Sequence, residues 1–331
     1  MKKTKIVYCL VSNRKDYYYE QLLISLCSLR KHNPDAVVEV VCDHDTSSTL
    51  KGERRGIFEY GVQINSVETP AEWGNWERSR YIKTNLRTLT RGDYLFIDTD
   101  TVICASLDAV DAIPYEIAAE KDSHLDRPLP KFSECQHDTQ RWIWGQARKA
   151  GVNIEGLWHF NSGVMYVKDS PKAYDLYAKW SEHYSKCLAH GAKVDQLPLL
   201  LSNHELHGVI SPLDPKMNCQ VAFDEGRKML PGVKIIHYFP EQKKTMLASP
   251  WILDPIKETG KINASIQQII DQPDQFFDSI SMVVTGDAAT LVDTHYLLEA
   301  YTTCPKVFKV FVYLLNRYLS EKKKLRKRMA R

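Results

Sequence analysis

The stretch YLFIDTD, residues 94–100, predicts both the fold class and the place of a functional site. Its first four residues are all apolar, which is typical of a strand buried on both faces of a parallel sheet between helices. Ligands bind such sheets beyond the carboxyl ends of the strands. Asp98 and Asp100 come directly after the strand, and two carboxylates at this spacing can hold a hard divalent cation. The stretch therefore predicts a metal site at this edge.

The same spacing of acids occurs a second time in the chain. Asp43 and Asp45 also follow an apolar run, residues 37–42, and they lie in the sequence DHDTSS. Acids in such a polar stretch at a strand end are more typical of turn and helix-cap residues. Two spaced acids are thus weak evidence by themselves, and the preference for Asp98 and Asp100 depends on the motifs that accompany them.

Strands and helices alternate over the first 110 residues. Apolar runs predict strands, and amphipathic segments between them predict helices. This alternation indicates right-handed crossovers and a mostly parallel, doubly wound α/β sheet. The chain has neither GxGxxG after its first strand nor a GxxxxGK[ST] loop, so bound phosphates would need a metal and side chains. The predicted strands are 5–11, 37–42, 62–67 and 94–97, and the predicted helices are 17–31, 47–60 and 78–89.

The rest of the chain divides into a loop-rich insert, a second run of elements and a helical end. Residues 121–159 are rich in Pro, His, Trp and charge and predict long loops with one helix near 142–150. Beyond them we expect a catalytic domain that ends near residue 250 and a helical extension, 251–331, with a basic tail. The predicted elements after the insert are strand 164–167, helices 171–189 and 197–201, and strand 233–236.

The distribution of charge along the chain argues against a nucleic-acid-binding protein. The net charge is +3, and the basic tail, residues 321–331, contributes +6 through seven Lys or Arg and one Glu. The remaining 320 residues therefore sum to −3, unlike the basic face of a nucleic-acid-binding domain. We expect no nucleic-acid partner.

The N-terminal sequence and the cysteine pattern favour a cytoplasmic protein. The apolar stretch 6–11 is too short for a signal peptide, and no segment approaches the length of a membrane span. The eight cysteines form no Cys-x-x-Cys pair and several lie in apolar runs, as expected of reduced, buried thiols.

Three further motifs follow the two acids: FNSG at 160–163, Asp195-Gln196 before a helix, and His237 after a strand. In this order they resemble the GT-A nucleotide-sugar transferases, most closely glycosyltransferase family 8, the glycogenin and lipopolysaccharide galactosyltransferase group. The resemblance covers residues 5–245. It implies a GT-A fold and a Mn²⁺ or Mg²⁺ ion held by Asp98, Asp100 and His237. The chain differs from the family at two places. Its first strand lacks the usual Thr-Asp, and the segment after His237 lacks the Gly that usually precedes the lysine and the Pro-Trp that usually follows it.

The resemblance also implies roles for other residues. Gln196 would lie under the anomeric carbon, with Asn161 and Asp195 contacting sugar hydroxyls, and transfer would retain the anomeric configuration. Gly163 would let the backbone approach the sugar. Positive side chains near the phosphates would stabilise the leaving group. The implied donor-binding set is Val11, Ser12, Tyr17, Arg80, Lys83, Thr99, Ser162, Gly163 and Lys243.

The expected activity is hexosyl transfer in polysaccharide biosynthesis, from a nucleoside diphosphate sugar such as a UDP-sugar to a saccharide or lipid-linked glycan. An apolar helical stripe over 307–318 precedes the basic cluster 322–328. It indicates peripheral docking on the inner face of a membrane, or else a packed helix with a solvated tail. Two other classes remain open: a sugar nucleotidyltransferase, which needs a Gly-rich loop that is missing, and a non-catalytic nucleotide-sugar or glycan-binding protein.

Overall fold

The computed structural model describes residues 3–239, 247, 250–277, 306–307, 310–314 and 317–318. The chain divides into two compact units, residues 1–283 and 284–331. In the described part of the second unit, residues 306–307, 310–314 and 317–318 are helical. Lys243 and the basic tail lie outside the described residues.

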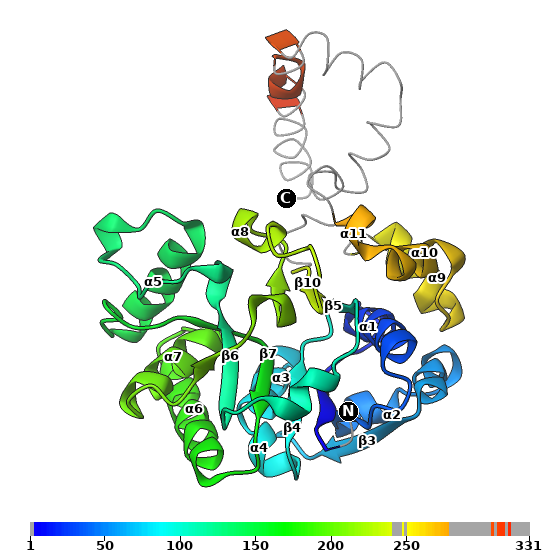
Figure 1. The fold of residues 1–331 in the computed structure, drawn as a ribbon, viewed down its shortest axis with the longest axis horizontal. Coiled ribbons are helices and arrows are strands. Elements are labelled where there is room, and N and C mark those ends of the chain that lie inside the picture. Colours follow the sequence, from blue (N-terminus) through cyan, green and yellow to red (C-terminus); the bar gives the residue numbers. More distant parts are fainter. Residues whose placement is uncertain are drawn as a thin grey trace. The chain divides into compact units, whose positions relative to one another are not determined.

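A seven-stranded sheet forms the centre of the first unit. Strands β1, β2, β3 and β4 pair in parallel, whereas β7 runs antiparallel between β4 and β6. Figure 1 shows β4, β7 and β6 side by side. The mostly parallel α/β sheet flanked by helices is confirmed. In spatial order the strands are β3 (Val62–Val67), β2 (Val38–Asp43), β1 (Lys5–Leu10), β4 (Tyr94–Ile97), β7 (Phe160–Val167), β6 (Ile117–Lys121) and β8 (Ser211–Pro212).

A small second sheet continues from the end of β4. It consists of β5 (Thr101–Ile103), β10 (Ile235–His237) and β9 (Cys219–Gln220) in that order. Residues 98–100 thus form the turn from one sheet to the other. Strand β10 runs antiparallel to β5 and places His237 opposite Thr101. This pairing brings a residue from late in the chain next to the two acids.

Helices cover both faces of the large sheet and bury alternate strand residues. Leu22 and Leu26 of α1 pack in the core on one face, while Ile82 of α3 and Trp180 of α6 pack on the other. The helices of the first unit are α1 (Tyr18–His32), α2 (His44–Ser48), α3 (Asn75–Thr84), α4 (Leu86–Leu89), α5 (Asp138–Ala150), α6 (Pro171–Ala189), α7 (Gln196–Glu205), α8 (Asp224–Arg227), α9 (Pro250–Thr259), α10 (Ala264–Asp271) and α11 (Pro273–Phe276).

Two predicted helices are each divided in the structure. The predicted helix 47–60 is α2 followed by a 3₁₀ helix, Gly52–Tyr60. Gly52 has a φ of 57°, a conformation that interrupts a helix and suits glycine. The predicted helix 78–89 is α3 followed by α4, because Asn85 leaves helical geometry and bonds the carbonyl of Tyr81 with its own side chain.

The insert and the C-terminal segment contain the helices expected there. Helix α5 begins four residues earlier than predicted and packs, through Ile143 and Ala147, in a separate small core with residues of α7. Beyond residue 250, α9 and α10 are helical, and Ile256 and Ile266 join the core that α1 also lines. The predicted domain boundary at residue 250 stays a prediction. Among the described residues, none of the helices has the length and apolar character needed to cross a membrane.

Candidate active site

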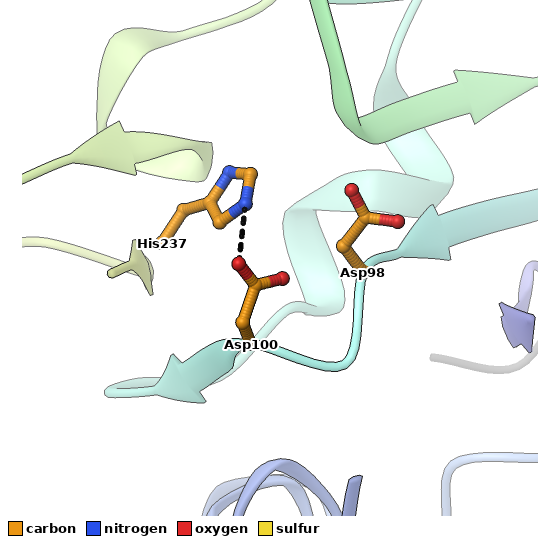
Figure 2. Close-up of side chains that lie close together, drawn as sticks. All are labelled: Asp98, Asp100 and His237. Atoms are coloured by element: carbon orange, nitrogen blue, oxygen red, sulfur yellow. Dashed lines mark ion pairs between the residues drawn. The ribbon is translucent and has the colours of Figure 1, made fainter. Parts of the chain in front are cut away.

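Asp98, Asp100 and His237 gather where the two sheets meet. Their ligand atoms all lie within 4.8 Å of one another, and His237 Nε2 is 3.4 Å from Asp100 Oδ2. Figure 2 shows both carboxylates and the imidazole pointing into the same space. Carboxylates are the ligands preferred by Mg²⁺ and Mn²⁺, and an imidazole is a common additional metal ligand. The residues present therefore fit the ion expected from the sequence.

The charges in this cluster depend on one another. Burial and the neighbouring Asp100 raise the pKa of Asp98, although the Lys83 ammonium opposes them. Burial would also raise the pKa of Asp100, but the attraction of His237 outweighs it and holds that pKa below its usual value. Burial would lower the pKa of His237, and Asp100 reverses this and raises it. Two close, half-buried acids attract a cation, and the side chains of His237 and Lys83 lie beside them.

Gly163 of the FNSG motif lies against the His237 ring. A Cβ atom at this position would meet Cε1 of His237 well inside van der Waals distance and Nδ1 at 2.7 Å. The carbonyl oxygen of Gly163 also accepts a hydrogen bond of 2.7 Å from the backbone N–H of Asp98. The glycine is thus required by the packing of the histidine. Its predicted approach to the sugar stays a prediction.

Lys83 lies between two acids that belong to different motifs, Asp98 and Asp195. Its Nζ lies 2.9 Å from Asp98 Oδ2 and 3.4 Å from Asp195 Oδ2, and the residue is 4% exposed. The side chain therefore reaches inward from α3. A fixed positive charge at this position can stabilise negative charge on a bound group.

Asp195 directs its side chain into the site. It occupies the N-cap position of α7, yet its carboxylate makes no capping hydrogen bond. Instead Ser162 Oγ donates to Asp195 Oδ2 at 2.7 Å, and Arg80 Nε lies 3.0 Å from Oδ1. Burial would raise the pKa of Asp195, but Lys83 and Arg80 outweigh it and hold that pKa well below its usual value. The structure thus brings Ser162, Arg80 and Lys83, all predicted to bind the donor, to the same acid.

Asp122 connects Asn161 and Gln196, and sequence reasoning missed it. Its Oδ1 accepts from Asn161 Nδ2 at 3.1 Å and from Gln196 Nε2 at 3.0 Å. The signal available in the sequence was its place directly after a strand, β6, where Asp98 stands after β4. Because long loops were predicted from residue 121 onward, the similar position of Asp122 after a strand was not recognised.

The turn that follows Asp122 is strained. Ser123 and His124 have φ values of 57° and 55°, which residues with side chains rarely adopt. Gln220 of β9 holds the turn, because its Oε1 accepts from the Ser123 N–H at 2.8 Å and its own N–H donates to His124 Nε2 at 3.0 Å. Such strain persists where the surroundings enforce it, and it clusters at functional sites.

The predicted donor residues at the end of β1 are placed near the carboxyl edge of the sheet. Val11 and Ser12 are buried, and Thr99 is buried between the two acids of the turn. Ser12 Oγ donates to Asp16 at 2.7 Å and accepts from Arg54 Nη2 at 2.9 Å. The hydroxyl of Tyr17 donates to Asp254, 2.7 Å away. These side chains contact one another and their neighbours, and their predicted nucleotide contacts stay predictions.

The second pair of spaced acids, Asp43 and Asp45, lies at the start of α2. Asp43 Oδ1 accepts from the Thr46 N–H at 3.1 Å at the start of α2. Arg78 pairs with Asp43 at 2.9 Å and also with Asp45. The helix-cap interpretation is confirmed for Asp43, whereas Asp45 lies in the first turn of α2.

Comparison with known proteins gives structural similarity only. No family model matches the chain, and no curated protein matches it. It is similar to a structure of the galactosyltransferase LgtC in complex with donor and acceptor sugar analogs, at 14% identity and a TM-score of 0.49, over 80% of this chain and 99% of that one. It is also similar to the glycosyltransferase GlyE of Streptococcus pneumoniae TIGR4, at 15% and 0.46, over 82% of this chain and 63% of that one.

A third similar structure is mouse xyloside xylosyltransferase 1, at 13% identity and a TM-score of 0.47, over 72% of this chain and 98% of that one. All three proteins are described as transferases of sugars. At these identities and TM-scores the likeness concerns the backbone and does not by itself assign a reaction to this chain.

Proposed function

We propose that this chain is a metal-dependent glycosyltransferase of the GT-A type. It moves a sugar, a hexose in the simplest case, from a nucleoside diphosphate donor such as a UDP-sugar to a saccharide or lipid-linked glycan. The observation that carries this proposal is the convergence of Asp98, Asp100 and His237 at the strand edge, next to the buried ammonium of Lys83.

The site supports departure of a nucleoside diphosphate. A divalent ion held by the two acids and the histidine would act as a Lewis acid on the diphosphate oxygens. Lys83 lies beside Asp98 and Asp195 and adds a fixed positive charge in a site of low dielectric constant. Both features favour the transition state, because negative charge grows on the leaving oxygen there.

Polar side chains beside the ion site fit a sugar ring. Asp122 holds the Nε2 end of the Gln196 carboxamide, which leaves the carbonyl end to stabilise positive charge at the anomeric carbon. Ser162 lies with Asp195 on the same edge. An amide is a weak nucleophile, so we propose front-side attack by the acceptor hydroxyl with retention of configuration.

The proposed activity is tested by donor turnover. With Mn²⁺, we expect the purified chain to release nucleoside diphosphate from one member of a panel of UDP-, GDP- and ADP-sugars, and to transfer its sugar to a glycan acceptor. EDTA should stop the reaction, because the diphosphate then lacks its cation. The readout is nucleoside diphosphate released, with transfer followed by mass spectrometry. Turnover that is equally fast in EDTA would contradict the proposal, and calorimetric binding without turnover would favour a non-catalytic binding protein.

We also propose that the protein is cytoplasmic and docks on the inner face of a membrane. Several side chains of the described helical residues after 305 are apolar and exposed: Val307, Val310, Phe311, Tyr313, Leu314 and Tyr318. The basic tail follows them in sequence, and the two features together favour anionic lipid. We expect the full chain to sediment with phosphatidylserine vesicles and to stay in solution with phosphatidylcholine vesicles. Equal binding to both, or none, would remove the proposal.

A further inference from the structure

Asn218 lies between the proposed metal ligand His237 and Asn161, which is predicted to contact sugar hydroxyls. It follows the 3₁₀ helix Pro215–Met217 and directly precedes β9, and its side chain is fully buried. Its Nδ2 donates to Asn161 Oδ1 at 3.0 Å, and its Oδ1 lies 3.1 Å from His237 Nδ1. One buried amide thus contacts both halves of the site.

The direction of these hydrogen bonds is fixed by the backbone. The N–H of Gly163 donates to Asn161 Oδ1 at 2.9 Å, and a backbone N–H can only donate, so an oxygen must occupy this position of Asn161. The other end of the same amide, Nδ2, then faces the acceptor Asp122 Oδ1. Asn218 must therefore present its NH₂ group to Asn161 and its carbonyl oxygen to His237.

This orientation selects one tautomer of the neutral imidazole. The carbonyl oxygen of Asn218 only accepts, so Nδ1 of His237 carries the hydrogen. The lone pair then lies on Nε2, the atom 3.4 Å from Asp100 Oδ2, directed toward the carboxylates in Figure 2. The ring is held on one face by Phe239, which stacks on it at 3.9 Å between centroids, and at its Cε1–Nδ1 edge by Gly163.

We propose that Asn218 is a positioning residue that holds His237 in the Nδ1–H tautomer and so leaves Nε2 available to bind the ion. Through Asn161, Asn218 also links the histidine to Asp122 and Gln196. Asn218 itself contacts neither ion nor sugar. The role toward the ion rests on the proposed function, whereas the tautomer is a property of the protein alone. Hydrogen bonds to the second nitrogen of a ligating histidine raise its basicity and fix its orientation.

The test combines imidazole ¹⁵N NMR of the metal-free protein with Mn²⁺ titration by EPR. At a pH where the ring is neutral, the His237 signals, assigned by their loss in His237→Gln, should report Nδ1–H. In Asn218→Leu, which keeps the volume and removes the acceptor, we expect mixed tautomers and a Mn²⁺ dissociation constant about 10- to 100-fold higher. Asn218→Asp keeps an oxygen facing Nδ1 and should retain the Nδ1–H tautomer.

Asn203→Leu is the matched control. Asn203 is a buried amide of α7 whose Oδ1 accepts from the Ile210 N–H at 2.9 Å, away from the three ligands. We expect this variant to lose stability and keep both the tautomer and the Mn²⁺ affinity. The inference is overturned if Asn218→Leu keeps the wild-type tautomer, or if both leucine variants weaken Mn²⁺ binding equally. A wild-type protein that shows Nδ1–H and the Asn218 effect, yet turns over no donor, would overturn the proposed function and leave the positioning role standing.

Discussion

We expect the double variant Asp98→Asn/Asp100→Asn to lose measurable Mn²⁺ binding and to turn over the donor about a thousandfold more slowly. Asparagine keeps the size of each side chain and removes its charge, so the change removes the attraction for the cation with little effect on packing. Mn²⁺ binding is measured by EPR titration, and turnover by the initial rate of nucleoside diphosphate release.

The control for this experiment lies in the same chain. Asp43→Asn/Asp45→Asn changes two acids of identical spacing, both of which pair with Arg78. Asparagine can still cap α2 at position 43, but the variant should be less stable because the charge of the mostly buried Arg78 loses both partners. It should keep the wild-type Mn²⁺ affinity when assayed while folded. If both double variants lose Mn²⁺ affinity to the same extent, the effect is general and the assignment of Asp98 and Asp100 fails.

Gly163→Ala should disable the metal site without touching a proposed ligand. The new Cβ would overlap the His237 ring, so either the imidazole or strand β7 has to move. Ligand displacement of this kind should raise the Mn²⁺ dissociation constant about 10- to 100-fold, and overpacking should lower the free energy of unfolding by about 1–3 kcal/mol. Both are measured on one preparation, by EPR titration and urea denaturation.

Gly145→Ala provides the comparison for this variant. Gly145 lies inside α5, and nothing is within 4 Å of the Cβ that alanine would add. Alanine is favoured over glycine in a helix by about 1 kcal/mol, so this variant should be more stable and should bind Mn²⁺ as the wild type does. Wild-type Mn²⁺ affinity in Gly163→Ala would show that the close packing of Gly163 and His237 does not matter for the ion.

The sequence predicted those elements whose pattern is local and strong. Strands 62–67 and 94–97 and helix 171–189 are found at the predicted residues. The apolar run 94–97 is buried throughout, and Pro171 at the first turn starts the long helix. The spaced acids were visible for the same reason, since they directly follow a continuous apolar strand.

The sequence could not reveal contacts between distant residues. Strand β9 has only two residues, Cys219–Gln220, and its pairing with β10 leaves no periodic pattern. Asn218 precedes that strand and contacts a histidine and an amide far away in the chain. Nothing in the local sequence shows that α3 turns the Lys83 side chain toward Asp98 and Asp195. These features arise from tertiary packing.

The location of the ion tests the central claim most directly. Crystals of the protein grown with Mn²⁺ and a nucleoside diphosphate should show an anomalous manganese peak bound by Asp98, Asp100 and His237, with the diphosphate oxygens completing its coordination. A manganese peak at any other place, with these three side chains left without the ion, would contradict the account.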